Sequence, residues 1–464
     1  MGDELIGRLI ARLGEGSVRV GADIPAANCE DASHLTPVTP RALLLPRNTE
    51  EVSAALAICN EAGQPVVTQG GLTGLAAGAH PGEGEVALSL QRMRGIEEID
   101  PVAGTLTALA GTPLAEVQAA AEEAGFLCGI DLGARGTATI GGNVATNAGG
   151  NQVVRYGMTR RNVLGLEAVQ ADGTVLTSLN KMMKNNTGYD WTQLFIGSEG
   201  TLGVVTRVVL GLHPKPVAVE TALLAAPSAD AALAILARLQ SRFGGELLTF
   251  EAMWREFIDV AVKRIKLPAP FAESHEVVLL VELGTGDPER VTTVLGELME
   301  EGLIVDAHLA QSGNDAARMW AYRESVYEYG QFQGNQINLD VSLPRGSIGA
   351  AVDALREVAA REWPAAVQVI FGHVADSNLH VVVGPLDGGG GFVTPEGKHT
   401  VDEGVYAVVR RFHGSISAEH GIGRLKRPYL GYSRTPAELA LMHTLKKALD
   451  PKGILNPGRV LEPM

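Results

Sequence analysis

The sequence predicts an α+β fold, because two long stretches of the chain carry different patterns of apolar residues. Residues 37–213 combine many glycines with short valine and leucine runs, whereas residues 216–412 alternate strand-like apolar runs with helix-like segments. The second pattern is typical of an open sheet covered by helices. With 464 residues, 45% of them hydrophobic, the chain is long enough for two or three domains.

Charge and cysteine content narrow the class of protein. The net charge of −15 opposes association with the phosphates of nucleic acids. Cys29, Cys59 and Cys128 lack the spacing of a metal site or of disulfides, so no iron–sulfur cluster is expected and a reducing compartment suits them. The first residues form no basic, apolar signal, and no window of about 20 uncharged apolar residues follows. We therefore expect a cytoplasmic protein without a nucleic-acid partner.

The glycine-rich region begins with a helix, a strand and a loop in close succession. Asn48 or Thr49 is the expected N-cap of a helix that continues through residues 54–62 and ends at Gly63. Residues 65–68 then form a short strand, and a loop rich in glycine follows it at once.

Three segments of the chain are glycine-rich loops: residues 69–78, 133–150 and 197–203. Glycines at this density let backbone amides approach an anion closely, and turns with positive φ can direct several amides at one diphosphate. One such loop is equally well explained as a tight turn, but three favour a dinucleotide cofactor. Neither a Gly-x-Gly-x-x-Gly fingerprint after a strand nor a Walker A sequence is present, which argues against ordinary nicotinamide or ATP binding.

The middle of the chain supplies the strands and helices of the expected open sheet. Residues 225–238 are predicted to form a capped helix after a strand, and residues 277–283 and 338–343 are predicted strands. Residues 388–391 are expected to be a flexible glycine loop, and no internal repeat is present.

Two histidines near the C-terminal end are candidate metal ligands. If residues 375–378 close a hairpin, Val374 faces Leu379 and His373 faces His380 across the ladder. Directly opposed residues have Cβ atoms about 4.5–5.5 Å apart, which is close enough for two imidazoles to share one divalent ion. Histidines near a turn are also commonly solvent-facing or structural.

The dipeptide Glu419-His420 adds a carboxylate and a third imidazole to these candidates. Glu419 offers the oxygen ligand that zinc and related metals accept. In an extended segment His420 points away from its neighbour and is left for proton transfer. A metal-dependent hydrolase with an activated water would use the same groups, but it would leave the three glycine-rich loops unexplained.

Five separated motifs together resemble one family of flavoproteins. In the N-terminal half they are residues 65–74, 140–150 and 197–203, which resemble the FAD-binding domain of the vanillyl-alcohol oxidase and p-cresol methylhydroxylase family. Residues 416–423, Ile-Ser-Ala-Glu-His-Gly-Ile-Gly, and residues 449–458 are similar to its D-2-hydroxy-acid dehydrogenase branch. That branch includes FAD-linked D-lactate and D-2-hydroxyglutarate dehydrogenases and the flavin subunit of glycolate oxidase. The resemblance covers residues 37–460.

The resemblance implies a two-part FAD-binding domain of the vanillyl-alcohol oxidase type and a substrate-capping domain with an open sheet covered by helices. The expected boundaries are residues 1–215 for the FAD domain, 216–412 for the cap, and 413–464 for a segment that returns to the FAD domain. The implied cofactor-binding residues are Gly70, Gly71, Thr73, Gly74, Gly141, Gly142, Asn143, Asn147, Gly200, Thr201 and Asn456. Many relatives attach FAD through a histidine in the first loop, where this chain has Leu72 or Thr73, so we expect non-covalent FAD.

The same resemblance assigns roles at the active site. His373, His380 and Glu419 match ligands of a divalent metal, for which zinc is expected and manganese, iron or cobalt are compatible. His420 matches the active-site base and Asn378 a substrate-site amide.

Arg323 matches an arginine that grips the substrate carboxylate, and its planar fork suits a bidentate contact. From the residues alone, a surface helix arginine paired with Glu324 or Glu328 is the alternative.

Two positions near Arg323 bear on the substrate. Relatives that act on D-2-hydroxyglutarate have a small hydroxyl residue and a lysine where this chain has Tyr327 and Asn338. A second substrate carboxylate would be poorly paired there, so we expect a monocarboxylic D-2-hydroxy acid, D-lactate or a larger apolar relative. Tyr327 would equally suit a hydrogen bond to a distal group. A D-2-hydroxyglutarate or D-malate dehydrogenase, or the flavin subunit of a glycolate oxidase complex, is the alternative.

The expected reaction is metal-assisted oxidation of the alcohol to the 2-oxo acid, with hydride transfer from C2 to flavin N5. No second redox centre is expected in this chain, so an external acceptor such as an electron-transfer flavoprotein, a cytochrome or a quinone-linked partner would take the electrons. A homodimer and a subunit of a larger complex are both compatible with the sequence.

Overall fold

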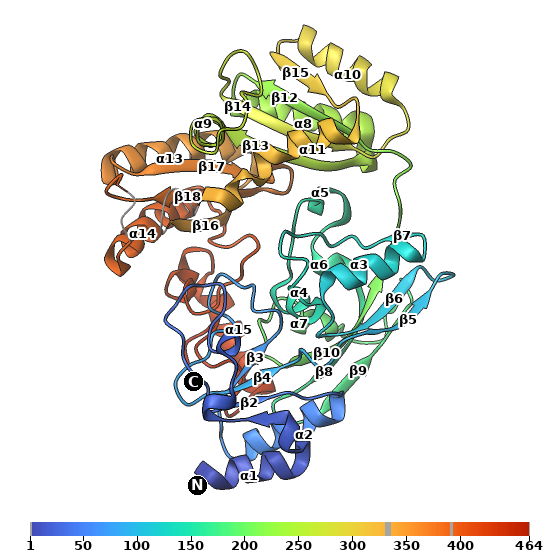
Figure 1. The fold of residues 1–464 in the computed structure, drawn as a ribbon, viewed down its shortest axis with the longest axis vertical. Coiled ribbons are helices and arrows are strands. Elements are labelled where there is room, and N and C mark those ends of the chain that lie inside the picture. The colour runs from blue at the N-terminus through green and yellow to red at the C-terminus, as the bar shows by residue number, and fades with distance from the viewer. Residues whose placement is uncertain (1, 330–335, 390–392, 464) are drawn as a thin grey trace. The chain divides into compact units, whose positions relative to one another are not determined.

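The computed structural model describes residues 2–329, 336–389 and 393–463, and the chain divides into two compact units. Unit 1 contains residues 1–150, 156–215 and 419–464, and unit 2 contains residues 151–155 and 216–418. Figure 1 shows helices and sheets in both units. Of the glycine loop expected at residues 388–391, residues 390 and 391 lie outside the described ranges.

A four-stranded sheet in the order β1-β2-β4-β3 forms the first part of unit 1. Its strands are β1 (Val18–Arg19), β2 (Ala42–Leu44), β3 (Val66–Gln69) and β4 (Val86–Ser89), of which β2, β4 and β3 run parallel. Helices α1 (Gly2–Leu13) and α2 (Thr49–Glu61) pack with it in one apolar core. The Asn48 side chain accepts the backbone N–H of Glu51 at 2.8 Å, so Asn48 is the N-cap of α2. The predicted helix and strand of this region are confirmed.

A five-stranded antiparallel sheet in the order β5-β6-β10-β8-β9 forms the second part of unit 1. The strands are β5 (Ile96–Asp100), β6 (Thr105–Leu109), β8 (Val163–Val169), β9 (Val175–Ser178) and β10 (Val204–Gly211), and β7 (Phe126–Leu127) pairs with β11 (His213–Pro214). The helices are α3 (Leu114–Glu123), α4 (Ile140–Thr146), α6 (Thr159–Asn162), α7 (Thr192–Phe195) and α15 (Pro436–Leu449), with α5 (Val153–Tyr156) at the boundary of the units.

Unit 2 is built on a seven-stranded antiparallel sheet in the order β15-β12-β14-β13-β17-β18-β16 (Figure 1). Its strands are β12 (Glu220–Ala226), β13 (Leu247–Trp254), β14 (Val277–Leu283), β15 (Asp306–Leu309), β16 (Ile337–Ser342), β17 (Val367–Gly372) and β18 (Asn378–Gly384). Its helices are α8 (Ala229–Phe243), α9 (Arg255–Lys263), α10 (Pro288–Glu300), α11 (Gly313–Glu324), α13 (Ile348–Glu362) and α14 (Pro395–Arg411). The expected open sheet covered by helices is confirmed.

One apolar cluster of unit 2 positions the candidate site. Met253 of β13 and Phe371 of β17 lie on the face of the sheet that packs against Phe257 of α9 and Met319 of α11. The same face carries polar side chains where β13, β17 and β18 meet, as described below.

In unit 2, one strand has the predicted limits and one helix begins later than predicted. Strand β14 has the predicted limits, residues 277–283. The helix predicted at residues 225–238 instead begins at Ala229, because the Ser228 side chain accepts the Ala231 N–H at 3.1 Å and residues before it continue β12.

No described helix is long and apolar enough to cross a lipid bilayer.

Candidate active site

The hairpin that carries the two candidate histidines differs in register from the prediction. The loop consists of residues 374–377, since Asn378 donates its backbone N–H to the carbonyl of His373 at 3.2 Å, and His380 lies opposite Phe371. The expected pairing of His373 with His380 was wrong, as was that of Val374 with Leu379. Ser377 adopts a left-handed conformation, with φ of 80°, and this closes the loop one residue earlier than expected, after the turn Val374–Asp376.

The register change leaves the two imidazoles as diagonal neighbours on one face of the sheet. Their ring centroids are 5.4 Å apart and the ring planes are inclined at 81°. Diagonal cross-strand residues remain within reach of long side chains. The expected proximity of His373 and His380 is therefore found, although by a different geometry.

Glu251 of β13 lies beside His373 and is completely buried. Its Oε1 is hydrogen-bonded to Nδ1 of His373, and its Oε2 accepts from Nε of Arg323 at 2.6 Å. Burial alone would raise the pKa of Glu251, but the electrostatic interactions and hydrogen bonds with His373 and Arg323 outweigh it and lower the pKa to about 2. Glu251 is therefore an ionised carboxylate with both oxygens in use.

Arg323, at the last turn of α11, is also buried, with its side chain 8% exposed. Its guanidinium carbon lies 4.7 Å from the centroid of the Phe371 ring. Glu251 accepts from Nε, and the two terminal nitrogens of Arg323 donate to no acceptor among the described residues. The alternative of a surface arginine paired with Glu324 or Glu328 does not apply, and the fork of the guanidinium remains available for a carboxylate.

Asp340 of β16 is a second fully buried carboxylate and lies opposite His380 in the ladder. Its Oδ1 accepts from Nδ2 of Asn378 at 2.7 Å, and its Oδ2 accepts the backbone N–H of Ala418 at 3.0 Å. These contacts fix the orientation of the Asn378 amide. The Oδ1 atom of Asn378 is buried and has no hydrogen-bond partner among the described residues, so it can accept from a bound molecule.

Glu419 and His420 directly follow Ala418, the last residue of unit 2, so the peptide chain ties them to the amide held by Asp340. Two groups of three residues could hold a metal ion, because the candidate ligand atoms within each group lie within 4.8 Å of one another. The first group is His373, His380 and Glu419, and the second is Asp340, His380 and His420. The first group has the composition of a metal site with two imidazoles and one carboxylate.

Tyr327 and Asn338 are candidate substrate residues that make no hydrogen bond or ion pair with this cluster among the described residues. Tyr327 is 71% exposed, in the short 3₁₀ turn that follows α11. Asn338 is exposed in β16, two residues before Asp340 and therefore on the same face of the strand.

The first glycine-rich loop in unit 1 has the properties of an anion site. The backbone amides of Gly70, Gly71, Thr73 and Gly74 donate to no described protein acceptor. A Cβ on Gly71 would lie 2.0 Å from the carbonyl oxygen of Thr137, so only glycine fits at this approach.

The second glycine-rich segment contains a helix that the sequence did not reveal. Gly141, Gly142 and Asn143 form the first turn of α4, and Asn147 ends it at φ of 50°. The expectation of a continuous loop over residues 133–150 was wrong, because Thr139 caps the helix by accepting the N–H of Gly142 at 3.3 Å. Nδ2 of Asn143 is buried and unpartnered within the described structure, as expected of a group that awaits a ligand.

Asn456 joins the C-terminal segment to the third glycine-rich loop. Its side chain accepts the N–H of Thr68 at 2.8 Å and donates to the carbonyl of Glu199 at 2.6 Å, next to Gly200. Thr201 accepts from the buried Nζ of Lys446 at 2.8 Å.

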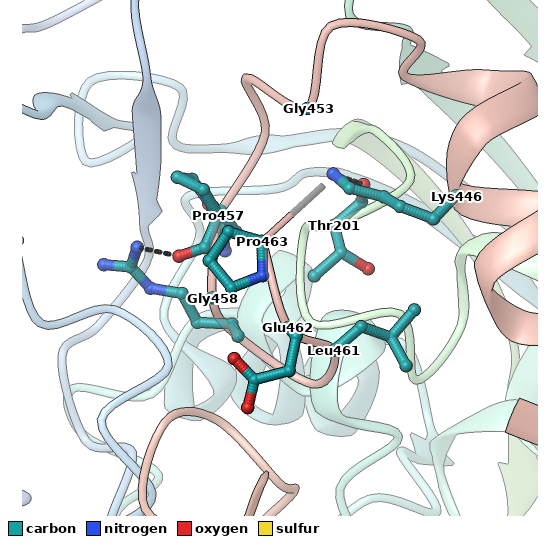
Figure 2. Close-up of a pocket in the computed structure, with 10 residues that line it drawn as sticks. Thr201, Lys446, Gly453, Pro457, Gly458, Leu461, Glu462 and Pro463 are labelled. Atoms are coloured by element: carbon teal, nitrogen blue, oxygen red, sulfur yellow. Dashed lines mark hydrogen bonds between the residues drawn. The ribbon is translucent and has the colours of Figure 1, made fainter.

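Figure 2 shows a small pocket that is bordered by Thr201, Lys446 and Asn456. Thr201 and Lys446 line one part, and residues 453, 456–459 and 461–463 line the rest. The pocket lies beside the expected cofactor residues Thr201 and Asn456.

Glu199 anchors the segment that follows His420. Its carboxylate accepts the backbone amides of Ile422 at 2.7 Å and Gly423 at 2.8 Å. Burial raises the pKa of Glu199, and the two amide hydrogen bonds and the charge of Lys426 oppose this shift.

Sequence reasoning missed the roles of Glu251 and Asp340. Each is a carboxylate inside an apolar strand, Leu247–Trp254 or Ile337–Ser342, where an unpaired charge would be strongly unfavourable. That contrast was the available signal for a buried polar cluster. Glu199 lay in the glycine-rich motif at residues 197–203, but nothing local indicated its contact with residues 422 and 423.

Comparisons with known proteins agree with this architecture. Residues 40–178 match the FAD binding domain model, and residues 215–460 match the model described as FAD linked oxidases, C-terminal domain. The chain is 40% identical over 430 residues to the mitochondrial D-2-hydroxyglutarate dehydrogenase of Bos taurus, with 91% of this chain and 77% of that protein covered. It is 34% identical to the D-2-hydroxyglutarate dehydrogenase of Stutzerimonas stutzeri, with 98% of both chains covered.

Solved structures show the same fold. A crystal structure of p-cresol methylhydroxylase with substrate bound has a TM-score of 0.76 and 18% identity, covering 99% of this chain and 97% of that one. The open amides of the first glycine-rich loop and the unpartnered Asn143 fit the FAD that the matched domains bind. The chain therefore belongs to the FAD-linked oxidase family and is an FAD-dependent oxidoreductase.

Proposed function

We propose that this protein oxidises a D-2-hydroxy acid to the corresponding 2-oxo acid with the help of a divalent metal ion. The observation that carries the proposal is the grouping in unit 2 of an arginine with a free fork, two neighbouring imidazoles and an unpartnered amide oxygen. These are the groups needed to hold a carboxylate, a metal ion and a hydroxyl.

The metal ligands in this proposal are His373, His380 and Glu419. Nδ1 of His373 is hydrogen-bonded to Glu251, and Nε2 is the ring nitrogen that binds the ion in this proposal. The metal, when bound, supplies a Lewis acid for the 2-hydroxyl oxygen, and zinc suits this donor set, as do manganese, iron and cobalt.

The remaining steps belong to side chains of this chain. Arg323 holds the substrate carboxylate through its terminal nitrogens, and Oδ1 of Asn378 accepts from a substrate hydroxyl. His420 takes the proton of the 2-hydroxyl, which makes loss of hydride from C2 easier. Bound FAD supplies the hydride acceptor, and the electrons then leave to an external acceptor such as an electron-transfer flavoprotein, a cytochrome or a quinone-linked partner.

Two substrate classes are supported by different observations. Tyr327 and Asn338 add no cation for a second carboxylate, which favours a monocarboxylic acid such as D-lactate or a larger apolar relative. The similarity to D-2-hydroxyglutarate dehydrogenases favours D-2-hydroxyglutarate.

Anaerobic bleaching of the flavin by a panel of D- and L-2-hydroxy acids tests the proposal and separates these classes. We expect bleaching by D-acids only, fastest with a monocarboxylate. Faster bleaching by D-2-hydroxyglutarate would select the second substrate class. A flavin that no acid of the panel alters would contradict the proposed function and indicate a flavin carrier or a subunit active only in a complex.

A further inference from the structure

We propose that Glu251 is a positioning residue that aligns the metal ligand His373 and the carboxylate-binding Arg323 with each other. The inference rests on the proposed function and deepens it. Each oxygen of this carboxylate has one hydrogen-bond partner: Oε1 is hydrogen-bonded to Nδ1 of His373, and Oε2 accepts from Nε of Arg323. A single rigid group thereby connects the part of the site that binds the metal with the part that binds the substrate carboxylate.

The strand that carries Glu251 determines where the carboxylate lies. In the β13–β17 ladder Ala252 pairs with Gly372 and Met253 pairs with Phe371, which brings Glu251 beside His373 at the end of β17. Met253 and Glu251 share one face of the strand, and that face packs against α11, the helix that carries Arg323. All of these residues belong to unit 2, so the arrangement is internal to one compact body.

The hydrogen bond to His373 selects which ring nitrogen can bind a metal. A metal ligand must be a neutral imidazole, and an ionised carboxylate only accepts, so in the metal-binding form of His373 the proton lies on Nδ1 and Nε2 is the nitrogen that can bind the metal. A neutral amide in place of the carboxylate could donate to Nδ1 instead. The ring proton would then move to Nε2 and block the metal-binding lone pair.

The hydrogen bond to Arg323 leaves the fork of the guanidinium unobstructed. Glu251 accepts from Nε, and the ring of Phe371 supports the guanidinium plane at 4.7 Å from its carbon atom. The two terminal nitrogens are therefore held in a fixed plane and can make a bidentate contact. A purely structural ion pair would require neither this choice of nitrogen nor the simultaneous contact with His373.

The test compares Glu251→Gln with a matched control, Glu282→Gln. Glu282 lies on the adjacent strand β14 and accepts from Trp320 of the same helix α11 at 2.8 Å, but within the described structure it makes no hydrogen bond or ion pair with Arg323 or His373. Zinc is titrated into metal-stripped, FAD-containing protein, and KM and kcat are measured with D-lactate and D-2-hydroxyglutarate.

We expect Glu251→Gln to weaken zinc binding by about 10–100-fold, as losses of carboxylate partners of metal-bound histidines do, and to raise KM as well. FAD content should stay at the wild-type level, and Glu282→Gln should match wild type in zinc affinity, KM, kcat and FAD content. Zinc affinity and KM within twofold of wild type in Glu251→Gln would overturn the inference, as would equal losses in both variants.

A second variant and the behaviour of the wild-type protein separate the possible outcomes. If Glu251→Gln does not fold, Glu251→Asp replaces it in the test. This variant keeps the charge but shortens the side chain, so we expect the same loss of zinc affinity and rise in KM from its reduced reach. Wild-type values in Glu251→Asp would overturn the inference. If wild-type protein binds no zinc or is not bleached by either acid, the proposed function itself fails, whereas normal wild type and normal Glu251→Gln refute only the role of Glu251.

Discussion

Asp340 accepts a hydrogen bond from Nδ2 of Asn378 at 2.7 Å. This completely buried carboxylate therefore fixes the direction of the Asn378 side-chain oxygen, Oδ1, which has no hydrogen-bond partner among the described residues. The second oxygen of Asp340 accepts the backbone of Ala418. One buried side chain thus orients the proposed substrate contact, Asn378, and the chain segment that leads to Glu419 and His420.

Replacing Asp340 by asparagine should therefore impair catalysis and stability together. One carboxylate oxygen becomes an NH₂ group that faces a donor, which is expected to reduce the free energy of unfolding by about 1–3 kcal/mol. We expect kcat to fall while bound FAD is retained, measured by steady-state turnover and flavin absorbance. Asp353→Asn, at an exposed position on α13, is the control and should leave both unchanged. Unaltered kcat in Asp340→Asn would show that the Asn378 orientation does not matter.

Arg323→Lys tests the carboxylate fork. A lysine cannot bond Glu251 and a substrate carboxylate in the same plane, and the loss of one charge-assisted hydrogen bond of about 2 kcal/mol lowers kcat/KM by about 30-fold. Most of the effect should fall on KM. Arg318→Lys on the exposed side of the same helix is the control. Equal kinetics for the two variants would remove Arg323 from substrate binding.

Gly71→Ala tests the first cofactor loop. The new methyl group would lie 2.0 Å from the carbonyl oxygen of Thr137, so the backbone has to move and its amides would no longer converge. We expect purified protein with strongly reduced FAD content, measured from the ratio of flavin to protein absorbance. Gly136→Ala, where nothing lies within 4 Å, should bind FAD normally. Full occupancy in Gly71→Ala would contradict the assignment of this loop.

The raised pKa of Glu199 predicts a pH dependence of stability. Burial makes the folded protein hold this proton at a higher pH than the unfolded chain, whose carboxyl titrates near 4.5. The free energy of unfolding should therefore fall as the pH rises from 4.5 through the raised pKa, by at most about 1.4 kcal/mol per pH unit.

Urea unfolding of Glu199→Gln at a series of pH values measures this contribution as a difference from wild type. The falling component should be absent in the variant. Glu438, whose pKa is lowered by hydrogen bonds from Thr435, provides a control in which replacement removes a contribution of the opposite sign. Identical pH profiles for wild type and Glu199→Gln would show that Glu199 does not contribute.

Local sequence signals predicted the elements and the residue types of the site, but not their pairing. Asn48 is a strong capping residue and the run Val277–Leu283 is apolar except for Glu282, so both elements were predictable. The hairpin register depended on Ser377 adopting a left-handed conformation, which serine adopts only when the turn requires it.

The partners of the functional residues were hidden for a different reason. Glu251 is 72 positions from Arg323 and 122 from His373 in the sequence, and Asp340 is 78 positions from Ala418. Only the order of strands in the unit 2 sheet brings them together, and that order is not encoded in any one segment.

The most direct test of the central claim is metal-dependent bleaching of the flavin under anaerobic conditions. Wild-type protein, His380→Ala and the control His308→Ala, which replaces an exposed histidine of β15, are each stripped of metal and then given zinc. All three should retain FAD. We predict that a D-2-hydroxy acid bleaches wild type and His308→Ala only after zinc is restored, and never bleaches His380→Ala. Equal bleaching of stripped and restored wild type, with normal bleaching of His380→Ala, would contradict a metal-assisted oxidation.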